Sequence, residues 1–285
     1  MFKRVMVAVV GIPFLLLVLA WAPEWATMVL LASMCGLGAY ELMRAVGGAK
    51  GKCLLPVTCL TATLVPVCLY VMTGWAQAEL TAMPVLPLVQ ALAMLFVFLL
   101  FAYAILHYGK ESAIPFGSLT AALFGGLVFP LMLSCLLLLR MWPYMGKYFV
   151  FLPLCISFGS DTFALFAGML FGKHKLAPLV SPKKTVEGAV GGILGGIFGV
   201  VLLNVIVSNL IRDPFMEPSH MLGFGIAGSI ISQIGDLSFS VIKREFGVKD
   251  YGNLLPGHGG ILDRFDSVTF VAPFVYLTLS ILWRL

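Results

Sequence analysis

The apolar run at residues 187–211 reads EGAVGGILGGIFGVVLLNVIVSNLI. Its 25 residues contain one charged side chain, Glu187. A helix that crosses the hydrocarbon core of a bilayer needs about 20 mostly apolar residues. Because the run is continuous and does not alternate, it predicts a helix and not a strand of a membrane barrel. This segment is therefore a predicted transmembrane helix.

Two rows of small residues run along the same segment. Glycine recurs every four residues at Gly188, Gly192 and Gly196, and separately at Gly191, Gly195 and Gly199. Small residues at this spacing allow helices to pack closely in lipid. We assign these glycines to packing and not to chemistry.

The rest of the chain repeats the apolar pattern. With 187–211 included, the predicted spans are 5–21, 27–46, 53–74, 86–107, 118–139, 149–171, 187–211, 221–242 and 267–284. The chain is 60% hydrophobic and only 11% charged, whereas soluble domains carry about 25% charged residues. We predict an all-α polytopic membrane protein with about nine spans. It forms a single domain over 1–285, with N-terminal helices at 1–148 and catalytic helices and loops at 149–285.

The distribution of basic residues predicts the orientation of the spans. If the N-terminus is cytoplasmic, 14 of the 18 Lys and Arg residues lie inside and only Arg140, Lys147, Arg212 and Arg284 lie outside. Such a bias sets membrane topology. All five tryptophans then fall at the outer boundary, as interfacial anchors do. We expect a multi-pass protein of the inner (cytoplasmic) membrane whose active site faces the cytoplasm.

The first span also resembles a signal peptide. Lys3 and Arg4 precede an apolar run that ends in Ala20-Trp21-Ala22, a pattern typical of a cleavage site. The run is long for a signal peptide, and Pro23 directly follows the would-be cut. We expect the span to stay uncleaved.

Besides Glu187, which begins the span 187–211, three carboxylates lie inside predicted spans. Glu41 lies near the cytoplasmic end of the second span, where its side chain could reach the interface, so we assign it a structural role. Asp161 lies about halfway along the sixth span. A carboxylate there costs at least about 2.5 kcal/mol unless it faces protein, water or a cation. We interpret Asp161 as functional; the alternative is a carboxyl satisfied by neighbouring donors or held protonated.

Asp236 belongs to a polar stripe in the eighth span. Gln233, Asp236, Ser240 and Lys243 follow one another at intervals of three, four and three residues, which places them on one face of a helix. The stripe predicts one wall of a polar cavity that opens to the cytoplasm. A polar seam between two helices is the alternative.

The connection before the last span is rich in glycine and charge. Residues 249–266 read KDYGNLLPGHGGILDRFD. Asp263 and Asp266 share a face if a helix starts there, and a divalent cation would relieve their repulsion. Oxygen ligands favour Mg²⁺ over zinc. This D-x-x-D pair is weak alone, but the same region also carries His258, Arg264, Lys243, Arg244 and Lys249.

A second basic connection precedes the glycine-rich span. Ser181 and Thr185 flank Lys183 and Lys184 just before the predicted start of a helix. A helix N-terminus offers free N–H groups and a favourable dipole to a phosphate. The segment predicts anion binding. The carboxylates suit a hard cation, the lysines and arginines suit phosphate, and both groups are predicted to lie at the depth of the lipid headgroups. Together they indicate two substrates, a polyphosphate with bound Mg²⁺ and a lipid.

Residues 240–266 resemble the signature of the phosphatidate cytidylyltransferase (CDP-diacylglycerol synthase) family. The matching elements are Ser240, Lys243-Arg244, Lys249-Asp250, Gly252, Pro256, His258-Gly259-Gly260, Asp263-Arg264 and Asp266. Upstream, Asp161-Thr162, Gly172-Lys173, the stretch 181–185 and Glu187-Gly188 are similar to the family's second region. The likeness covers about residues 150–285, whereas the N-terminal half adds only its hydropathy.

The resemblance implies a Mg²⁺-dependent reaction of CTP with phosphatidate that gives CDP-diacylglycerol and pyrophosphate. The catalytic candidates are Asp236, Lys243, His258 and Asp263. The substrate-binding candidates are Ser181, Lys183, Lys184, Thr185, Ser240, Arg244, Lys249 and Arg264, and the metal candidates are Asp236, Asp263 and Asp266, with Asp161 as a further one. His258 could bind phosphate or shuttle a proton. No nucleic-acid partner is implied, and a homo-oligomer stays open.

Two other classes of function compete with this reading. The first is a CTP-dependent lipid kinase or another membrane phosphotransferase, which would need a base for a lipid hydroxyl. The second is a cation-coupled transporter that uses Asp161 and Asp236 as ion ligands. A transporter predicts paired inverted repeats, which the sequence does not show, and leaves the basic loops unexplained.

Overall fold

The structure is a computed structural model of the chain, and it describes residues 11, 13–79, 86–212, 215–252 and 259–282. The chain forms two compact units. The first consists of Met1–Met141 and Phe246–Arg264, and the second of Trp142–Glu245 and Phe265–Leu285. The segment that connects the last two spans therefore packs with the N-terminal helices.

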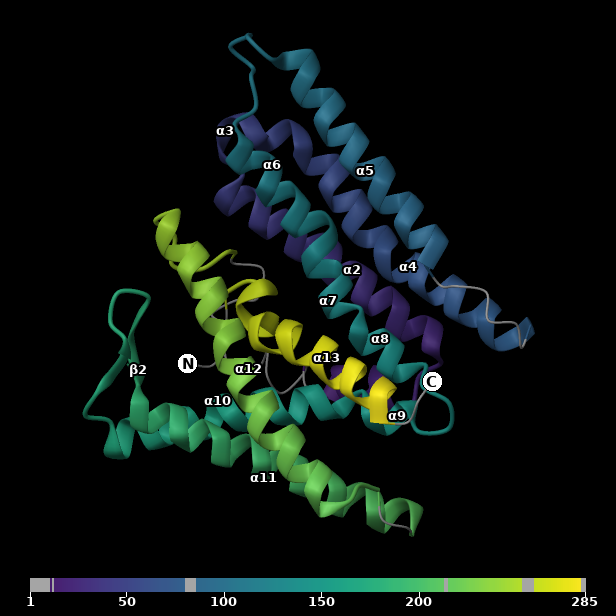
Figure 1. The fold of residues 1–285 in the computed structure, drawn as a ribbon, viewed down its shortest axis with the longest axis vertical. Helices are drawn as coiled ribbons and strands as arrows, with labels where there is room; N and C mark the ends of the chain where they lie inside the picture. Colours follow the sequence, from purple (N-terminus) through teal and green to yellow (C-terminus); the bar gives the residue numbers. More distant parts are fainter. Residues whose placement is uncertain (1–10, 12, 80–85, 213–214, 253–258, 283–285) are drawn as a thin grey trace. The chain divides into compact units, whose positions relative to one another are not determined.

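The first unit is built from helices (Figure 1). Residues 13–20 are helical. The elements that follow are α2 (Glu24–Val46), α3 (Gly48–Gly51), η1 (Lys52–Leu54), α4 (Leu55–Glu79), α5 (Leu86–His107), α6 (Phe116–Leu123), η2 (Phe124–Val128), α7 (Phe129–Leu133) and α8 (Cys135–Arg140). The predicted span 118–139 is thus a series of short helical segments. One of them, η2, is a π-helical turn whose Gly126 allows the ring of Phe96 to pack against the backbone.

The second unit is also mainly helical. Its elements are α9 (Gly146–Phe149), α10 (Phe151–Phe171), β1 (Lys175–Ala177), β2 (Ser181–Thr185), α11 (Val186–Ile211), α12 (Pro218–Glu245) and most of α13 (Leu262–Leu282). No strand was predicted, yet β1 and β2 pair as an antiparallel hairpin between α10 and α11, with Lys175 opposite Thr185. The pairing satisfies backbone groups of the connection. The all-α fold class is confirmed.

The glycine rows of α11 pack against α10 and α12. In one row, a Cβ at Gly195 or Gly199 would collide with the backbone of α10 at Gly159 or Cys155. The other row begins against α10 at Gly188 and ends against α12, where a Cβ at Gly196 would collide with Ser229. The prediction that these glycines serve close helix packing is confirmed. Because α11 touches both neighbours at backbone distance, it holds α10 and α12 close to each other within this unit.

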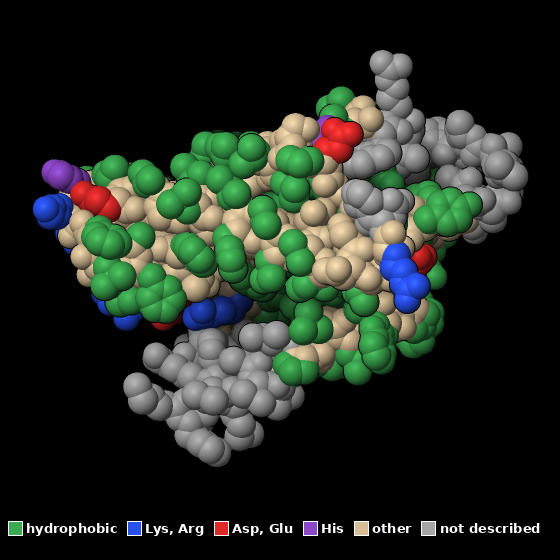
Figure 2. Space-filling view, turned by 90° about the horizontal axis from the view of Figure 1, so that it is seen from below, with side chains coloured by type: hydrophobic (Ala, Val, Ile, Leu, Met, Phe, Trp, Pro, Cys, Tyr) green, Lys and Arg blue, Asp and Glu red, His purple; other side chains and the backbone are tan. Residues whose placement is uncertain are grey.

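Eight helices of the described residues are long and apolar enough to cross a membrane. They correspond to the predicted spans after the first, and most of 5–21 lies outside the described residues. The last helix starts at Leu262, five residues before the predicted 267. Figure 2 shows hydrophobic side chains over much of one face, with charged side chains in a few separate clusters. The protein is a multi-pass membrane protein.

Candidate active site

The polar stripe of α12 exists as predicted. The helix runs without interruption from Pro218 to Glu245, so Gln233, Asp236, Ser240 and Lys243 lie along one face. Ser240 donates a hydrogen bond from Oγ to Asp236 Oδ1 at 3.3 Å. Gln233 donates to the carbonyl oxygen of Ala189 in α11 at 3.0 Å. The first part of the stripe therefore fastens α12 to α11, and the second part holds the Asp236 carboxylate.

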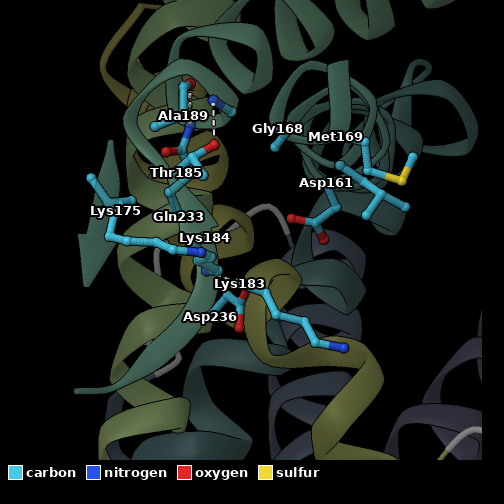
Figure 3. A pocket seen from close by; sticks show the side chains of 14 residues that line it. Asp161, Gly168, Met169, Lys175, Lys183, Lys184, Thr185, Ala189, Gln233 and Asp236 are labelled. Carbon is cyan, nitrogen blue, oxygen red and sulfur yellow. Dashed lines mark hydrogen bonds and ion pairs between the residues drawn. The ribbon is translucent and has the colours of Figure 1, made fainter. Parts of the chain in front are cut away.

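A cavity of about 570 Å³ lies next to Asp236. The polar and charged side chains along its wall include Asp161, Lys175, Lys183, Lys184, Gln233 and Asp236. They come from α10, the hairpin and α12, and Figure 3 shows the carboxylate of Asp161 pointing into the space between these elements. The second unit thus contains a polar chamber in which lysines and carboxylates meet.

The hairpin brings the lysines to this chamber. Lys184 in β2 forms an ion pair with Asp236. Thr185 follows as the N-cap of α11, and its Oγ1 accepts a hydrogen bond from the Gly188 N–H at 3.1 Å. Arg244, near the end of α12, donates from Nε to the Val180 carbonyl in the hairpin turn at 3.0 Å. The hairpin is therefore fixed both to the start of α11 and to α12.

A third carboxylate approaches from α13. The Ser267 hydroxyl donates to Asp161 Oδ2 at 3.4 Å, and the Ser267 N–H donates to Asp266 Oδ1 at 2.7 Å. Asp161, Asp236 and Asp266 are close enough to repel one another electrostatically, while Lys184 and Lys243 act in the opposite sense. Three carboxylates from three helices therefore interact electrostatically with one another in the second unit.

The Glu187 side chain binds the segment that connects α10 to the hairpin. Its carboxylate accepts hydrogen bonds from the backbone N–H groups of Lys173 and His174, and His174 Nδ1 lies 2.6 Å from Glu187 Oε1. An acidic residue in the first turn of a helix is favoured by the helix dipole. Glu187 therefore fixes the start of the hairpin at the N-terminus of α11.

Comparisons with known proteins identify the family. The profile of the cytidylyltransferase family matches residues 2–282, nearly the whole chain. The chain belongs to the cytidylyltransferase family. It is therefore an enzyme that transfers a nucleotidyl group.

Individual relatives agree with this assignment. A Bacillus subtilis (strain 168) protein named phosphatidate cytidylyltransferase is 35% identical over 191 residues, which cover 67% of this chain and 68% of the relative. Proteins of the same name from Thermotoga maritima and Staphylococcus aureus (strain COL) are 36% identical over 145 residues and 42% identical over 134 residues. These matches cover 46% and 47% of this chain, and 54% and 50% of the relatives.

The structure brings together part of the cytidylyltransferase site that the sequence predicted. Asp161, Asp236, Lys183 and Lys184 line the cavity, with Thr185 at its edge as a helix cap. Ser240, Lys243, Arg244 and Asp266 lie in the same unit. Ser181 is at the distant end of β2 and is not among the cavity-lining residues. The roles assigned to these residues stay predictions.

The remaining candidates lie in the first unit or outside the described residues. Lys249 and Arg264 are exposed in the first unit. Asp263 also belongs to it, and its Oδ2 accepts hydrogen bonds from the N–H groups of Tyr251 and Gly260 at 2.9 and 3.0 Å. His258 lies outside the described residues. One oxygen of Asp263 is therefore already engaged in shaping its own loop.

The carboxylates of the second unit suit a hard cation. Asp161, Asp236 and Asp266 offer only oxygen donors, which Mg²⁺ prefers, and Mg²⁺ takes its other ligands from water and substrate phosphates. Over the described ranges, however, no three His, Cys, Asp or Glu side chains are grouped so that they could hold a metal ion. The chemistry of the donors therefore fits Mg²⁺, but a group of three protein ligands is absent from these ranges.

Sequence reasoning did not assign roles to three residues of this site. Ser267 bridges Asp161 and Asp266, Lys175 lines the cavity, and Glu187 holds the hairpin. Glu187 matched the family's second region, which was a usable signal. Ser267 and Lys175 have no such signal, because a serine in a span and a lysine at a helix end are both common.

Proposed function

We propose that this cytidylyltransferase joins the cytidylyl group of CTP to phosphatidate and makes CDP-diacylglycerol and pyrophosphate. The observation that carries the proposal is the chamber in which Lys183 and Lys184 meet Asp161 and Asp236 within an otherwise apolar helical unit. The relatives are named phosphatidate cytidylyltransferase, which supports the choice of phosphatidate as the acceptor. Long apolar helices around the chamber suit a substrate with two acyl chains.

The reaction needs little covalent help from the protein. A phosphate oxygen of phosphatidate attacks the α-phosphorus of CTP, and the bond from this phosphorus to the bridging oxygen of the β-phosphate breaks. Pyrophosphate leaves with the bonding electron pair. A phosphate monoester has a second pKa of about 6, so the nucleophile is largely ionised near neutrality and needs no strong base. Positioning and charge neutralisation then dominate catalysis.

The lysines are placed to neutralise this charge. Lys183 and Lys184 line the cavity and would contact substrate phosphates, and Lys175 adds a third cation. The hydroxyls of Ser181 and Ser240, and the cations of Lys243, Arg244, Lys249 and Arg264, remain proposed substrate-binding groups. Lysine binds phosphate as a compact point charge, which suits several phosphate positions along a reaction.

Mg²⁺ is the proposed cofactor. When bound, it would offset the charge on the phosphates and on the leaving pyrophosphate. Asp236 and Asp266 are the proposed ligands, with Asp161, which interacts electrostatically with both, as a third. Asp263 of the first unit stays a further proposed ligand. The ion pair with Lys184 partly balances the charge of Asp236.

The distribution of charge supports a cytoplasmic active site in the inner membrane. The predicted inside connections carry 14 of the 18 basic residues, and the hairpin that lines the cavity holds Lys175, Lys183 and Lys184. CTP is an intracellular nucleotide, so the catalytic side must face the cytoplasm. Assembly into a homo-oligomer remains a prediction.

Product analysis tests the proposed function directly. Membranes that contain the protein are incubated with phosphatidate and CTP labelled at the α-phosphorus. We expect the label to appear in a CDP-lipid, with one pyrophosphate released per lipid formed. CTP labelled at the γ-phosphorus should label only pyrophosphate. A lipid labelled from the γ-position, with release of CDP, would instead show a lipid kinase and contradict the proposal.

Removal of Mg²⁺ should stop turnover. In excess chelator we expect the rate to fall to that of membranes without the protein, because the charge on the phosphates is no longer offset. Added Mg²⁺ in excess over the chelator should restore the rate, which controls for damage to the protein. Full activity in the chelator would remove the metal from the mechanism.

A further inference from the structure

We infer that Glu41 of α2 is a positioning residue for the signature loop, defined here by its described residues 246–252 and 259–264. This inference deepens the proposed function and rests on it. These described residues include three that are proposed to act on substrate or metal, namely Lys249, Asp263 and Arg264. Glu41 comes from the half of the chain in which the sequence showed only hydropathy.

The Glu41 side chain, which the sequence allowed to extend to the membrane surface, is instead buried in the first unit. Only 4% of the residue is exposed. Its Oε2 accepts a hydrogen bond from the backbone N–H of Leu262 at 3.1 Å. Leu262 is the first residue of α13. The carboxylate therefore holds the point at which the signature loop turns into the last helix.

The loop approaches the carboxylate at two glycines. A Cβ added at Gly252 would come within 2.5 Å of Glu41 Oε1, and one added at Gly260 would also overlap the carboxylate. Only residues without a Cβ allow the backbone to come this close. The loop is thus folded around the Glu41 side chain on two sides.

A second carboxylate fixes the same loop from within. Asp263 Oδ2 accepts hydrogen bonds from the N–H groups of Tyr251 and Gly260, which are nine residues apart in the sequence. Asp263 and Glu41 are close enough to interact electrostatically. The two carboxylates together determine the backbone path on both arms of the loop.

Stability alone does not account for Glu41. Its Oε1 is buried and accepts no hydrogen bond of good geometry from a described residue, although the backbone N–H of Ile261 also interacts with the carboxylate. A buried acceptor without a partner is unfavourable, and an apolar side chain of similar size would avoid this cost. A role in holding catalytic residues in place would account for a carboxylate that lowers the stability of the fold.

Hydrogen–deuterium exchange and kinetics of Glu41→Gln test the inference in the full-length protein in detergent or nanodiscs. Glutamine keeps the size and one acceptor but loses the charge. We expect amide exchange of peptides within 246–264 to rise about 10-fold, because a hydrogen bond to a neutral amide oxygen is weaker than one to a charged carboxylate. The kcat/KM for CTP should fall by at least a similar factor. Exchange in α4 and α5 should not change.

The matched control is Thr58→Ala. Thr58 is also fully buried in the first unit, but its hydroxyl donates to the Leu54 carbonyl, four residues earlier at the end of η1. We expect this variant to lower the melting temperature without changing exchange in the loop or kcat/KM of the folded protein. If Glu41→Gln behaves in the same way, Glu41 is merely structural and the inference is overturned.

A double-mutant cycle gives a second, independent readout. Gly252→Ala should also loosen the loop, because the new methyl group displaces the Glu41 carboxylate. Since both changes break the same contact, the combination of Glu41→Ala with Gly252→Ala should cost clearly less than the product of the two single effects. Additive effects would contradict the inference. The exchange readout needs no turnover, so failure of the CDP-lipid assay would leave it interpretable.

Discussion

Asp236→Asn should abolish most of the nucleotidyl transfer while the protein remains folded in the membrane. Asparagine has the same shape, and its oxygen can still accept the hydrogen bond that Ser240 gives to Asp236 Oδ1. The substitution removes only the negative charge, which forms an ion pair with Lys184 and interacts electrostatically with Asp161 and Asp266. Loss of one preorganised electrostatic partner typically lowers kcat roughly 100- to 1,000-fold. The measurement is the initial rate of CDP-lipid formation at saturating CTP and phosphatidate.

Glu245→Gln is the matched control for this change. Glu245 lies in the same helix, loses the same charge on substitution and is exposed away from the cavity wall. Its rate should stay within about 2-fold of the unmodified protein, as expected for a surface substitution. A rate close to normal in Asp236→Asn would remove this residue from the metal site and from catalysis.

Replacement of Lys184 by Ala should weaken the use of substrate phosphate. Lys184 enters the cavity from β2, and its ammonium group is paired with Asp236 in the absence of substrate. A charge-assisted hydrogen bond is worth about 1.5–3 kcal/mol, and about 1.4 kcal/mol corresponds to a factor of ten. We therefore expect kcat/KM for CTP or for phosphatidate to fall roughly 10- to 100-fold. The double variant with Lys183→Ala should fall further.

Lys173→Ala separates catalysis from topology. Lys173 lies in the same connection and contributes equally to the positive-inside bias, but its hydrogen bond to Glu187 is donated by the backbone N–H and not by the side chain. Its kinetics should be unchanged. If Lys184→Ala and Lys173→Ala behave alike, the lysines of the hairpin only orient the protein in the membrane. Combining Lys184→Ala with Asp236→Asn should give a strongly non-additive effect, because each variant already breaks the shared ion pair.

The fold was largely predictable because its signal is local. A run of about 20 apolar residues has one stable structure in lipid, a helix with every backbone group paired internally. The packing role of the α11 glycines was equally local, since a four-residue spacing already defines a helix face. The hairpin was not predicted, because β1 and β2 span only Lys175–Ala177 and Ser181–Thr185 and their sequences carry no alternating apolar pattern.

The site was predictable in kind but not in arrangement. Charged residues in an apolar sequence stand out, and the spacing of Gln233, Asp236 and Ser240 correctly predicted one face of a helix. The partners of those residues were not visible. Asp161 and Ser267 are separated by 106 positions, and Glu41 and Leu262 by 221, so no local pattern relates them.

The sequence by itself determined that this chain is a helical membrane protein with a polar, phosphate-suited region, since hydropathy and charge act on each segment independently. Only the tertiary structure decided which of its polar residues meet. It placed Lys184 beside Asp236, and it placed the Glu41 side chain of α2 against the signature loop. The physical reason is that a buried carboxylate must find donors wherever packing supplies them, and packing brings together residues that are distant in the chain.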